Sequence, residues 1–319
     1  MSAVSEQPWP RIAVVGAGAV GGYFGGMLAR AGAPVLMIGR PAFVDAVKGN
    51  GLFLDTLQFK ETVKVEASTQ LKDARDAEVV LFCVKTTDNA AAARELASVI
   101  SPTALVVSMQ NGVDNAEQIQ AASGIHALPS VVYIGAFVPQ PGSVKHGGRG
   151  DLVFGPENEQ TKRLAALFTR AGVPVRLSSN IQGDLWSKFL ANCALNAISA
   201  LGRTRYGQIA ADAEAWKSVE QAIAEVLAVA KASAVDLGSL AQLSEASAMA
   251  RKIATQLPEA YSSTAQDLMR GKRTEIDSLN GYIARRGAAL GVPTPVNHAL
   301  YTLVKLVEVS AKSAASAAY

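Results

Sequence analysis

Cysteine is scarce in this sequence, which has only Cys83 and Cys193 among 319 residues and no C-x-x-C motif. These two residues offer no disulfide framework and no thiolate metal site, and we expect a reducing, cytoplasmic environment. The three histidines, His126, His146 and His298, lack the spacing of metal ligands. We therefore expect no bound metal.

Charged residues are also few, at 18% of the chain, and the net charge is only +3. No block of lysine and arginine occurs, which argues against nucleic acid as the main partner. No run of eighteen apolar residues occurs, so we expect no membrane span. The first ten residues lack a basic segment, so the apolar stretch after them is not interpreted as a secretory signal. A hydrophobic content of 49% and this length instead indicate a globular chain of about two domains.

What the sequence does contain is a glycine-rich stretch, RIAVVGAGAVGGYFGGMLARAGAPVLMIGR, at residues 11–40. Its apolar runs at 12–15 and 35–38 predict buried strands, and the residues between them have a helical period. Glycines at G-x-G-x-x-G spacing in that setting are typical of a dinucleotide-binding turn. The predicted turn consists of Gly16, Ala17, Gly18, Ala19, Val20 and Gly21.

Each glycine of this turn has an expected purpose. Gly16 allows the tight turn, Gly18 lets the backbone approach a pyrophosphate, and Gly21 lets the helix pack on the strand. The phosphates are then expected on the free amides at the start of the helix. The alternative is a glycine-rich turn that binds nothing.

Arg40 ends the second apolar run, about twenty residues after the glycines, where NAD-binding chains normally have an acid. A carboxylate there would repel a ribose 2′-phosphate, whereas a guanidinium can hold it through two charged hydrogen bonds. We therefore predict NADP(H) as the cofactor. An ordinary surface arginine remains the alternative.

Strands and helices alternate through the first half of the chain, and almost only helical periods follow residue 181. The pattern predicts an α/β fold, with a Rossmann-type doubly wound sheet over residues 1–180 and a helical domain over 181–319. A small strand pair is expected at 52–54 and 63–65, and the low-complexity tail 310–319 is expected to fray. The remaining strand segments are AEVVLFCVKTTDN (containing Cys83), ALVVSMQNGVDN (running into a helix capped by Asp114), PSVVYIGAFV, SVKHGG, DLVFG and 173–177, with the third, fourth and fifth antiparallel.

Lys85 and Asn111 follow the fourth and fifth long strands at matching positions. Ligands of doubly wound sheets bind outside the carboxyl ends of the strands, so both side chains are candidates for contact with the nicotinamide side of the cofactor. Taken alone, Lys85 could be a solvated loop lysine, and Asn111 with the glycine after it could be only a turn.

The stretch GDLWSKFLANCALNAISALG predicts a helix that is apolar nearly all round and therefore buried. Lys188, Asn192 and Asn196 nevertheless recur at every fourth residue, on one face of it. Buried polar groups need partners, and a substrate cleft supplies them. Alternatively, the strip touches solvent or caps neighbouring backbone.

A second polar cluster lies in YSSTAQDLMRGKRTEIDSLNGY. It includes Ser262, Ser263, Glu275 and Asp277 between predicted helices. Glu275 alone would more often be a surface residue.

Together these motifs resemble the ketopantoate reductase (2-dehydropantoate 2-reductase) family over nearly the whole chain. The motifs are GAGAVG, the arginine after the second strand, VK, QNG, KFLANCALN and TEIDSLNG. The resemblance implies a lysine as general acid and a glutamate that anchors the substrate and the nicotinamide ribose, at Lys188 and Glu275. It implies Asn192, Asn196, Ser263 and Asn111 as substrate contacts and Arg40, Lys85, Asn111 and Glu275 as cofactor contacts.

The resemblance further implies NADPH-dependent reduction of 2-dehydropantoate to pantoate, in pantothenate and coenzyme A synthesis. Two alternatives remain: a related dehydrogenase acting on another 2-oxo or 3-hydroxy acid, and a non-catalytic NADP-binding sensor. A proton donor beside the nicotinamide argues against the sensor. The apolar helical domain also makes a homodimer a reasonable expectation.

Overall fold

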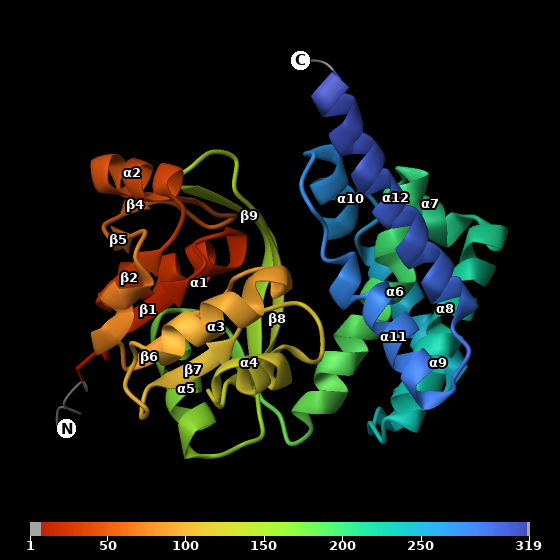
Figure 1. The fold of residues 1–319 in the computed structure, drawn as a ribbon, viewed down its shortest axis with the longest axis horizontal. Helices are drawn as coiled ribbons and strands as arrows, with labels where there is room; N and C mark the ends of the chain where they lie inside the picture. Colours follow the sequence, from red (N-terminus) through yellow and green to blue (C-terminus); the bar gives the residue numbers. More distant parts are fainter. Residues whose placement is uncertain (1–7, 318–319) are drawn as a thin grey trace. The chain divides into compact units, whose positions relative to one another are not determined.

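The computed structural model describes residues 8–317, with side chains as far as residue 310 (Figure 1). Contacts within the chain divide it into two compact units, Met1–Ile181 and Gln182–Tyr319, called here the N-terminal and C-terminal units. Of the tail predicted to fray, residues 310–317 belong to the helix Pro295–Ala317, and residues 318–319 lie outside the described residues.

The N-terminal unit is a ten-stranded mixed sheet in the order β4-β3-β9-β8-β7-β6-β1-β2-β5, with β10 paired to β9. The strands are β1 (Ile12–Val15), β2 (Val35–Ile38), β3 (Leu52–Asp55), β4 (Lys60–Val63), β5 (Glu66–Ser68), β6 (Val79–Phe82), β7 (Leu105–Ser108), β8 (Leu128–Phe137), β9 (Ser143–Phe154) and β10 (Val175–Leu177). The helices are α1 (Ala19–Arg30), α2 (Pro41–Asn50), α3 (Asn89–Ala97), α4 (Asn115–Ser123) and α5 (Glu159–Arg170), with short 3₁₀ turns η1 (Leu71–Asp76) and η2 (Thr86–Asp88).

Helices pack against both faces of the sheet. Successive residues of a strand point to opposite faces, so each central strand contributes to two cores. In β1, Ile12 and Val14 join the core that includes α1 and α5, whereas Ala13 and Val15 join the core under α3 and α4. β6 alternates in the same way. The strands β5, β2, β1, β6 and β7 run parallel, and β8 begins parallel to β7, so the predicted doubly wound architecture is confirmed.

The sheet curls around α1, which contacts seven of its strands: β4, β3, β9, β8, β6, β1 and β2. Glycines make this close packing possible. A Cβ at Gly22 would lie 2.6 Å from a methyl of Val144 in β9, and one at Gly26 would lie 2.9 Å from Leu54 in β3. On the other side, a Cβ at Gly25 would lie 2.7 Å from Val14 in β1.

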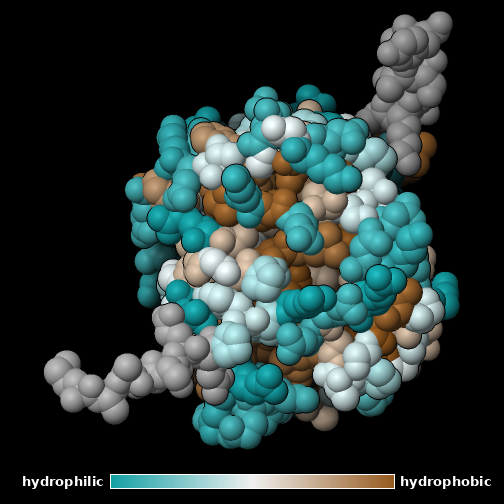
Figure 2. All heavy atoms as spheres, turned by 90° about the vertical axis from the view of Figure 1, so that its left-hand side faces the viewer, coloured by the Kyte–Doolittle hydropathy of each residue, from teal (hydrophilic) through white to brown (hydrophobic). Residues whose placement is uncertain are grey.

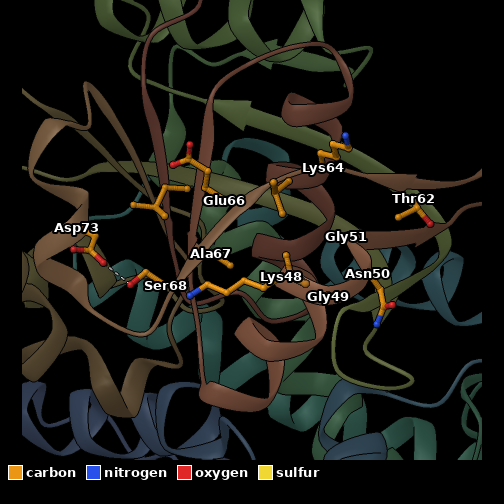
Figure 3. Close-up of a pocket in the computed structure, with 13 residues that line it drawn as sticks. Lys48, Gly49, Asn50, Gly51, Thr62, Lys64, Glu66, Ala67, Ser68 and Asp73 are labelled. Atoms are coloured by element: carbon orange, nitrogen blue, oxygen red, sulfur yellow. Dashed lines mark hydrogen bonds between the residues drawn. The ribbon is translucent and has the colours of Figure 1, made fainter.

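The two outer strands of the sheet, β4 and β5, are joined by only two residues, so the sheet edges meet at a seam. A hollow of ≈ 880 Å³ lies there, and its lining includes the apolar residues Leu36, Val47 and Val65. Figure 3 shows this hollow with the labelled residues Lys48, Lys64, Glu66 and Asp73 around it. Figure 2 shows the face on the left-hand side of Figure 1, where hydrophobic residues are interspersed with hydrophilic ones. No residue predicted for the functional site lines this hollow.

Four local predictions need correction. Residues 64–65 join strands instead of continuing one, because the short polar segment β5 pairs with β2 and begins at Glu66. SVKHGG and DLVFG form one strand, β9. Its pairing with β8 shifts register at two places, which accommodates glycines of β9. Asp114 does precede α4, but its side chain caps no backbone amide and instead accepts from Gln118 Nε2 at 2.8 Å. Cys83 lies one residue beyond β6 and is partly exposed.

The C-terminal unit is helical in the part that the structure describes, as predicted. Its long central helix, α6, starts at the last residue of the N-terminal unit and is largely buried. The elements are α6 (Ile181–Gly202), α7 (Tyr206–Ala211), α8 (Ala213–Ala232), α9 (Leu243–Gln256), α10 (Ser263–Met269), α11 (Asn280–Leu290) and α12 (Pro295–Ala317), with 3₁₀ turns η3 (Gly238–Ala241) and η4 (Ile276–Ser278).

Candidate functional site

The glycine turn between β1 and α1 has the geometry that its spacing predicts. Gly16 has a φ of +102°, and a Cβ there would lie 2.7 Å from the Cys83 backbone. A Cβ at Gly21 would lie 2.4 Å from the Gly16 carbonyl oxygen. Gly18, the N-cap of α1, has no atom within 4 Å of a built Cβ, so space is open in front of it. The turn is therefore tight on its inner side and accessible where a ligand would approach.

The start of α1 offers hydrogen-bond donors. The Gly22 N–H is bonded to the Gly18 carbonyl at 2.8 Å and begins the helical ladder. The amides of Ala19, Val20 and Gly21 precede that bond, and first-turn amides have no acceptor within their own helix. They suit an anion.

The candidate residues of the N-terminal unit lie at the carboxyl ends of its parallel strands. Val15, Ile38, Phe82 and Ser108 are register partners across β2, β1, β6 and β7. The glycine turn, Arg40, Lys85 and Asn111 follow these strand ends within three residues. The structure thus brings the predicted cofactor residues of this unit together at the carboxyl ends of neighbouring strands.

Arg40 is exposed at the start of α2 and pairs with no carboxylate among the described residues. It is held beside the glycine turn, because the amides of Gly16 and Ala17 both bond the Ile38 carbonyl, at 3.0 and 3.1 Å. Gly39 keeps the approach close, since a Cβ there would lie 3.2 Å from that of Ala17. The guanidinium is thus available to a phosphate near the turn.

A buried amide network that the sequence analysis did not identify ties the Lys85 and Asn111 loops together. Gln110 donates to the carbonyl of the residue before Lys85 at 2.7 Å, and also to Asn89. Asn89 donates to Asn115 at 2.9 Å, which donates to the Asn111 carbonyl at 2.7 Å. The network fixes the position of both loops relative to each other.

The polar strip on α6 runs from a half-buried to a buried position. Lys188 and Asn192 are half-buried, whereas Asn196 is only 2% exposed. The adjacent turns of the helix are apolar, and Trp186 packs edge-on against Phe189 at 5.4 Å between ring centroids. Lys188 and Asn192 therefore lie half-buried among apolar residues of the helix, where polar groups need partners.

Ser262 and Ser263 have different places at the start of α10. Ser262 is buried, donates to the Asn196 carbonyl at 2.9 Å and accepts from the Ala265 amide at 3.0 Å, so it is a structural cap. Ser263 is exposed, and its Oγ accepts from Asn196 Nδ2 at 3.4 Å. The structure thus joins two of the predicted substrate contacts.

Glu275 is half-buried and directly follows Thr274. Two hydrogen bonds hold Thr274 to Glu308, and this contact is called here the Thr274 clamp. Glu308 of α12 accepts from the Thr274 amide at 2.6 Å and from its hydroxyl at 2.7 Å. Burial alone would raise the pKa of Glu308, but the Thr274 hydrogen bonds and Lys305 outweigh it and lower the pKa below its usual value. The clamp is thus ionised at neutral pH and holds the segment that contains Glu275.

Asp277, on the same segment, is held from α12 as well. Lys305 Nζ donates to it at 2.9 Å and Tyr301 at 3.0 Å. Burial acts to raise the pKa of Asp277, and these two hydrogen bonds and the lysine charge lower it overall. Asp277 thus anchors the segment.

The predicted site residues fall into two sets, one in each unit. The turn, Arg40, Lys85 and Asn111 belong to the N-terminal unit, and the other candidates belong to the C-terminal unit.

Across the described residues, no helix is long and apolar enough to span a bilayer. Burial raises the pKa of both cysteine thiols.

Comparison with known proteins gives a consistent result over most of the chain. Family models described as ketopantoate reductase PanE/ApbA and its C-terminal part match residues 12–159 and 180–308. Among curated relatives, a 2-dehydropantoate 2-reductase of Pyrococcus horikoshii is 30% identical over 304 residues, covering 93% of this chain and 97% of the relative. One of Archaeoglobus fulgidus is 31% identical over 302 residues, covering 93% and 98%.

Solved structures agree. A PanE/ApbA family ketopantoate reductase from Ralstonia eutropha JMP134 superposes with a TM-score of 0.90 at 44% identity, covering 95% of this chain and 99% of that one. A ternary structure of D-mandelate dehydrogenase with NADH and anilino(oxo)acetate has a TM-score of 0.86 at 25% identity, covering 95% and 99%.

Proposed function

The chain belongs to the ketopantoate reductase PanE/ApbA family of oxidoreductases, and from this membership we propose that it reduces 2-dehydropantoate to pantoate with NADPH. The observation that most supports a catalytic role is the strip on α6. Lys188 and Asn192 lie half-buried in a largely buried helix, and a sensor that only binds a cofactor needs neither.

The N-terminal unit fits a dinucleotide phosphate. The space in front of Gly18 admits a pyrophosphate against the first amides of α1, and Arg40 is available to a 2′-phosphate. Lys85 and Asn111 would then face the nicotinamide side. When bound, NADPH supplies a hydride to the carbonyl carbon of the 2-oxo acid.

In the C-terminal unit, Lys188 Nζ would donate a proton to the ketone oxygen as negative charge develops there. Such a donor stabilises the transition state more than the ground state. Asn192 and Ser263 would orient the substrate without adding a negative charge that repels its carboxylate. Glu275, fixed by the Thr274 clamp, would anchor the substrate and the nicotinamide ribose.

The proposal is tested by following NADPH oxidation spectrophotometrically with 2-dehydropantoate, pyruvate and an aryl 2-oxo acid. The aryl compound is included because the D-mandelate dehydrogenase structure resembles this one. We expect the highest kcat/KM with 2-dehydropantoate. A higher value with another acid would favour the related dehydrogenase, and no turnover with any 2-oxo acid would contradict the proposal.

Replacing Arg40 with alanine should raise the KM for NADPH about tenfold to more than a hundredfold and leave that for NADH nearly unchanged. The reason is that a charged, bidentate hydrogen bond contributes roughly 1.5–3 kcal/mol, and only NADPH has the phosphate that makes it. Steady-state kinetics with both cofactors measure the effect. Arg163→Ala, an exposed arginine on α5, is the control. Equal losses with both cofactors would rule out the 2′-phosphate contact.

We also propose a homodimer formed through α12. Every exposed position of this helix between residues 299 and 310 is uncharged. Leu303, Leu306 and Val309 are 49, 57 and 60% exposed. Contiguous apolar surface of this kind marks interaction sites, and an uncharged face can meet its own copy without repulsion between like charges.

Light scattering after size exclusion should give wild type twice the 33.2 kDa chain mass and Leu306→Glu the mass of one chain. The glutamate would have to be buried without a partner in the interface. Leu243→Glu, at an exposed leucine of α9, should stay dimeric. A monomeric wild type, or a dimeric Leu306→Glu variant, would disprove the α12 interface.

A further inference from the structure

Tyr206, the first residue of α7, lies beside the substrate residues proposed in the C-terminal unit, although it belongs to no motif identified in the sequence. Its hydroxyl donates to Asn196 Oδ1 at 2.9 Å. Burial raises the pKa of the Tyr206 phenol, so the group remains a neutral donor. Its ring is half-buried.

The backbone around Tyr206 is fixed to the segment that leads into α10. The Tyr206 amide donates to the Ala260 carbonyl at 3.0 Å, and the Gly207 amide donates to that of Pro258 at 3.0 Å. The contact is tight, because a Cβ at Gly207 would lie 2.9 Å from Pro258. Tyr206 therefore has a defined position relative to Ser263, three residues beyond Ala260.

The Asn196 amide lies between two hydroxyls, that of Tyr206 and that of Ser263. With Oδ1 accepting from Tyr206, the Nδ2 group is directed to Ser263 Oγ, 3.4 Å away. The side chain is 2% exposed, so solvent cannot take over either bond. Because Ser263 Oγ accepts from Asn196, its own hydrogen is left to donate to another acceptor.

We propose that Tyr206 is a positioning residue of the substrate site, acting through Asn196 to make the exposed Ser263 hydroxyl a donor to an acceptor oxygen of the substrate. This inference rests on the proposed function, in which Ser263 contacts a 2-oxo acid. Tyr206 itself need not touch the substrate. Its effect is confined to the orientation of the Asn196 amide.

A double-mutant cycle tests this role. Tyr206→Phe keeps the ring and removes the hydroxyl, and should raise the KM for the 2-oxo acid about two- to tenfold, the range of one net hydrogen bond. Affinity for NADPH should stay within twofold of wild type. In an Asn196→Ala background, the same Tyr206→Phe change should leave KM unaltered, since the group that it orients is gone.

A second readout does not depend on turnover. The side-chain amide signals of Asn196, assigned by their loss in Asn196→Ala, should shift in ¹⁵N-labelled Tyr206→Phe. Ser247→Ala removes another buried hydroxyl hydrogen bond of the same unit, 2.7 Å to Glu220, and should change neither KM nor these signals. It controls for general destabilisation.

The outcomes are distinct. An unchanged KM in Tyr206→Phe, an equal effect in the Asn196→Ala background, or unshifted amide signals would overturn the positioning role. If wild type reduces no 2-oxo acid, the proposed function fails. Shifted Asn196 signals would then still support the orienting contact by itself.

Discussion

Replacing Lys188 with alanine should lower kcat at least a hundredfold while NADPH affinity stays within twofold of wild type. General acid catalysis typically contributes about 10²–10⁴-fold, and the residues proposed for the dinucleotide phosphates all lie in the N-terminal unit. Stopped-flow or steady-state NADPH oxidation gives kcat, and NADPH fluorescence titration gives the affinity. Lys217→Ala, an exposed lysine on α8, should behave as wild type.

A second substitution separates proton donation from charge alone. Arginine at position 188 keeps a positive charge, but a guanidinium does not lose its proton in proteins. Lys188→Arg should therefore be nearly as impaired as Lys188→Ala. Recovery of most activity by arginine would assign Lys188 an electrostatic role, and near-normal turnover in Lys188→Ala would remove it from the reaction.

Two substitutions in the glycine turn should have the second large effect, one on NADPH binding and the other on thermal stability. Gly18→Ala should fold normally, because its methyl meets no protein atom within 4 Å, yet it should weaken NADPH binding about tenfold or more by occupying the space proposed for the pyrophosphate. Gly21→Ala should lower the Tm by roughly 2–12 °C, because its Cβ would lie 2.4 Å from the Gly16 carbonyl and overpacking costs about 1–3 kcal/mol.

Thermal melts and NADPH titrations of both variants distinguish the two purposes. Gly148→Ala is the control, because Gly148 has no positive φ and its surroundings are open. Gly124→Ala is not suitable, because the positive φ of Gly124 would strain an alanine. Full NADPH affinity in Gly18→Ala would show that the phosphates lie elsewhere.

Much of the N-terminal fold was predictable because its signals are local. The apolar runs of β1, β2, β6 and β7 are short, continuous and followed by polar turns, and their lengths match the observed strands closely. β5 gave no such signal: Glu66–Ser68 is polar and becomes a strand only by pairing with β2. The continuity of β9 likewise depends on the neighbouring strand and not on its own glycine-containing sequence.

The candidate site divides in the same way. Positions at strand ends, such as Lys85 and Asn111, follow from topology once the strands are recognised, and the strip on α6 follows from helical spacing. Gln110 and Tyr206 could not be found like this. Their partners lie in other segments, and nothing in the adjacent sequence marks a long-range amide or hydroxyl contact.

The wrapping of the sheet around α1 has a consequence for local stability. A helix on an open face can fray or detach while the sheet persists, but α1 touches seven strands and cannot leave without separating them. Its first turn, which offers the amides proposed for the cofactor, therefore shares the opening free energy of the whole unit instead of having a lower one of its own. Protection of the hydrogen-bonded amides of α1, beginning with that of Gly22, against hydrogen exchange should consequently report global unfolding of the N-terminal unit. The phosphate site is then rigid before any ligand arrives, and binding need not include the cost of ordering it.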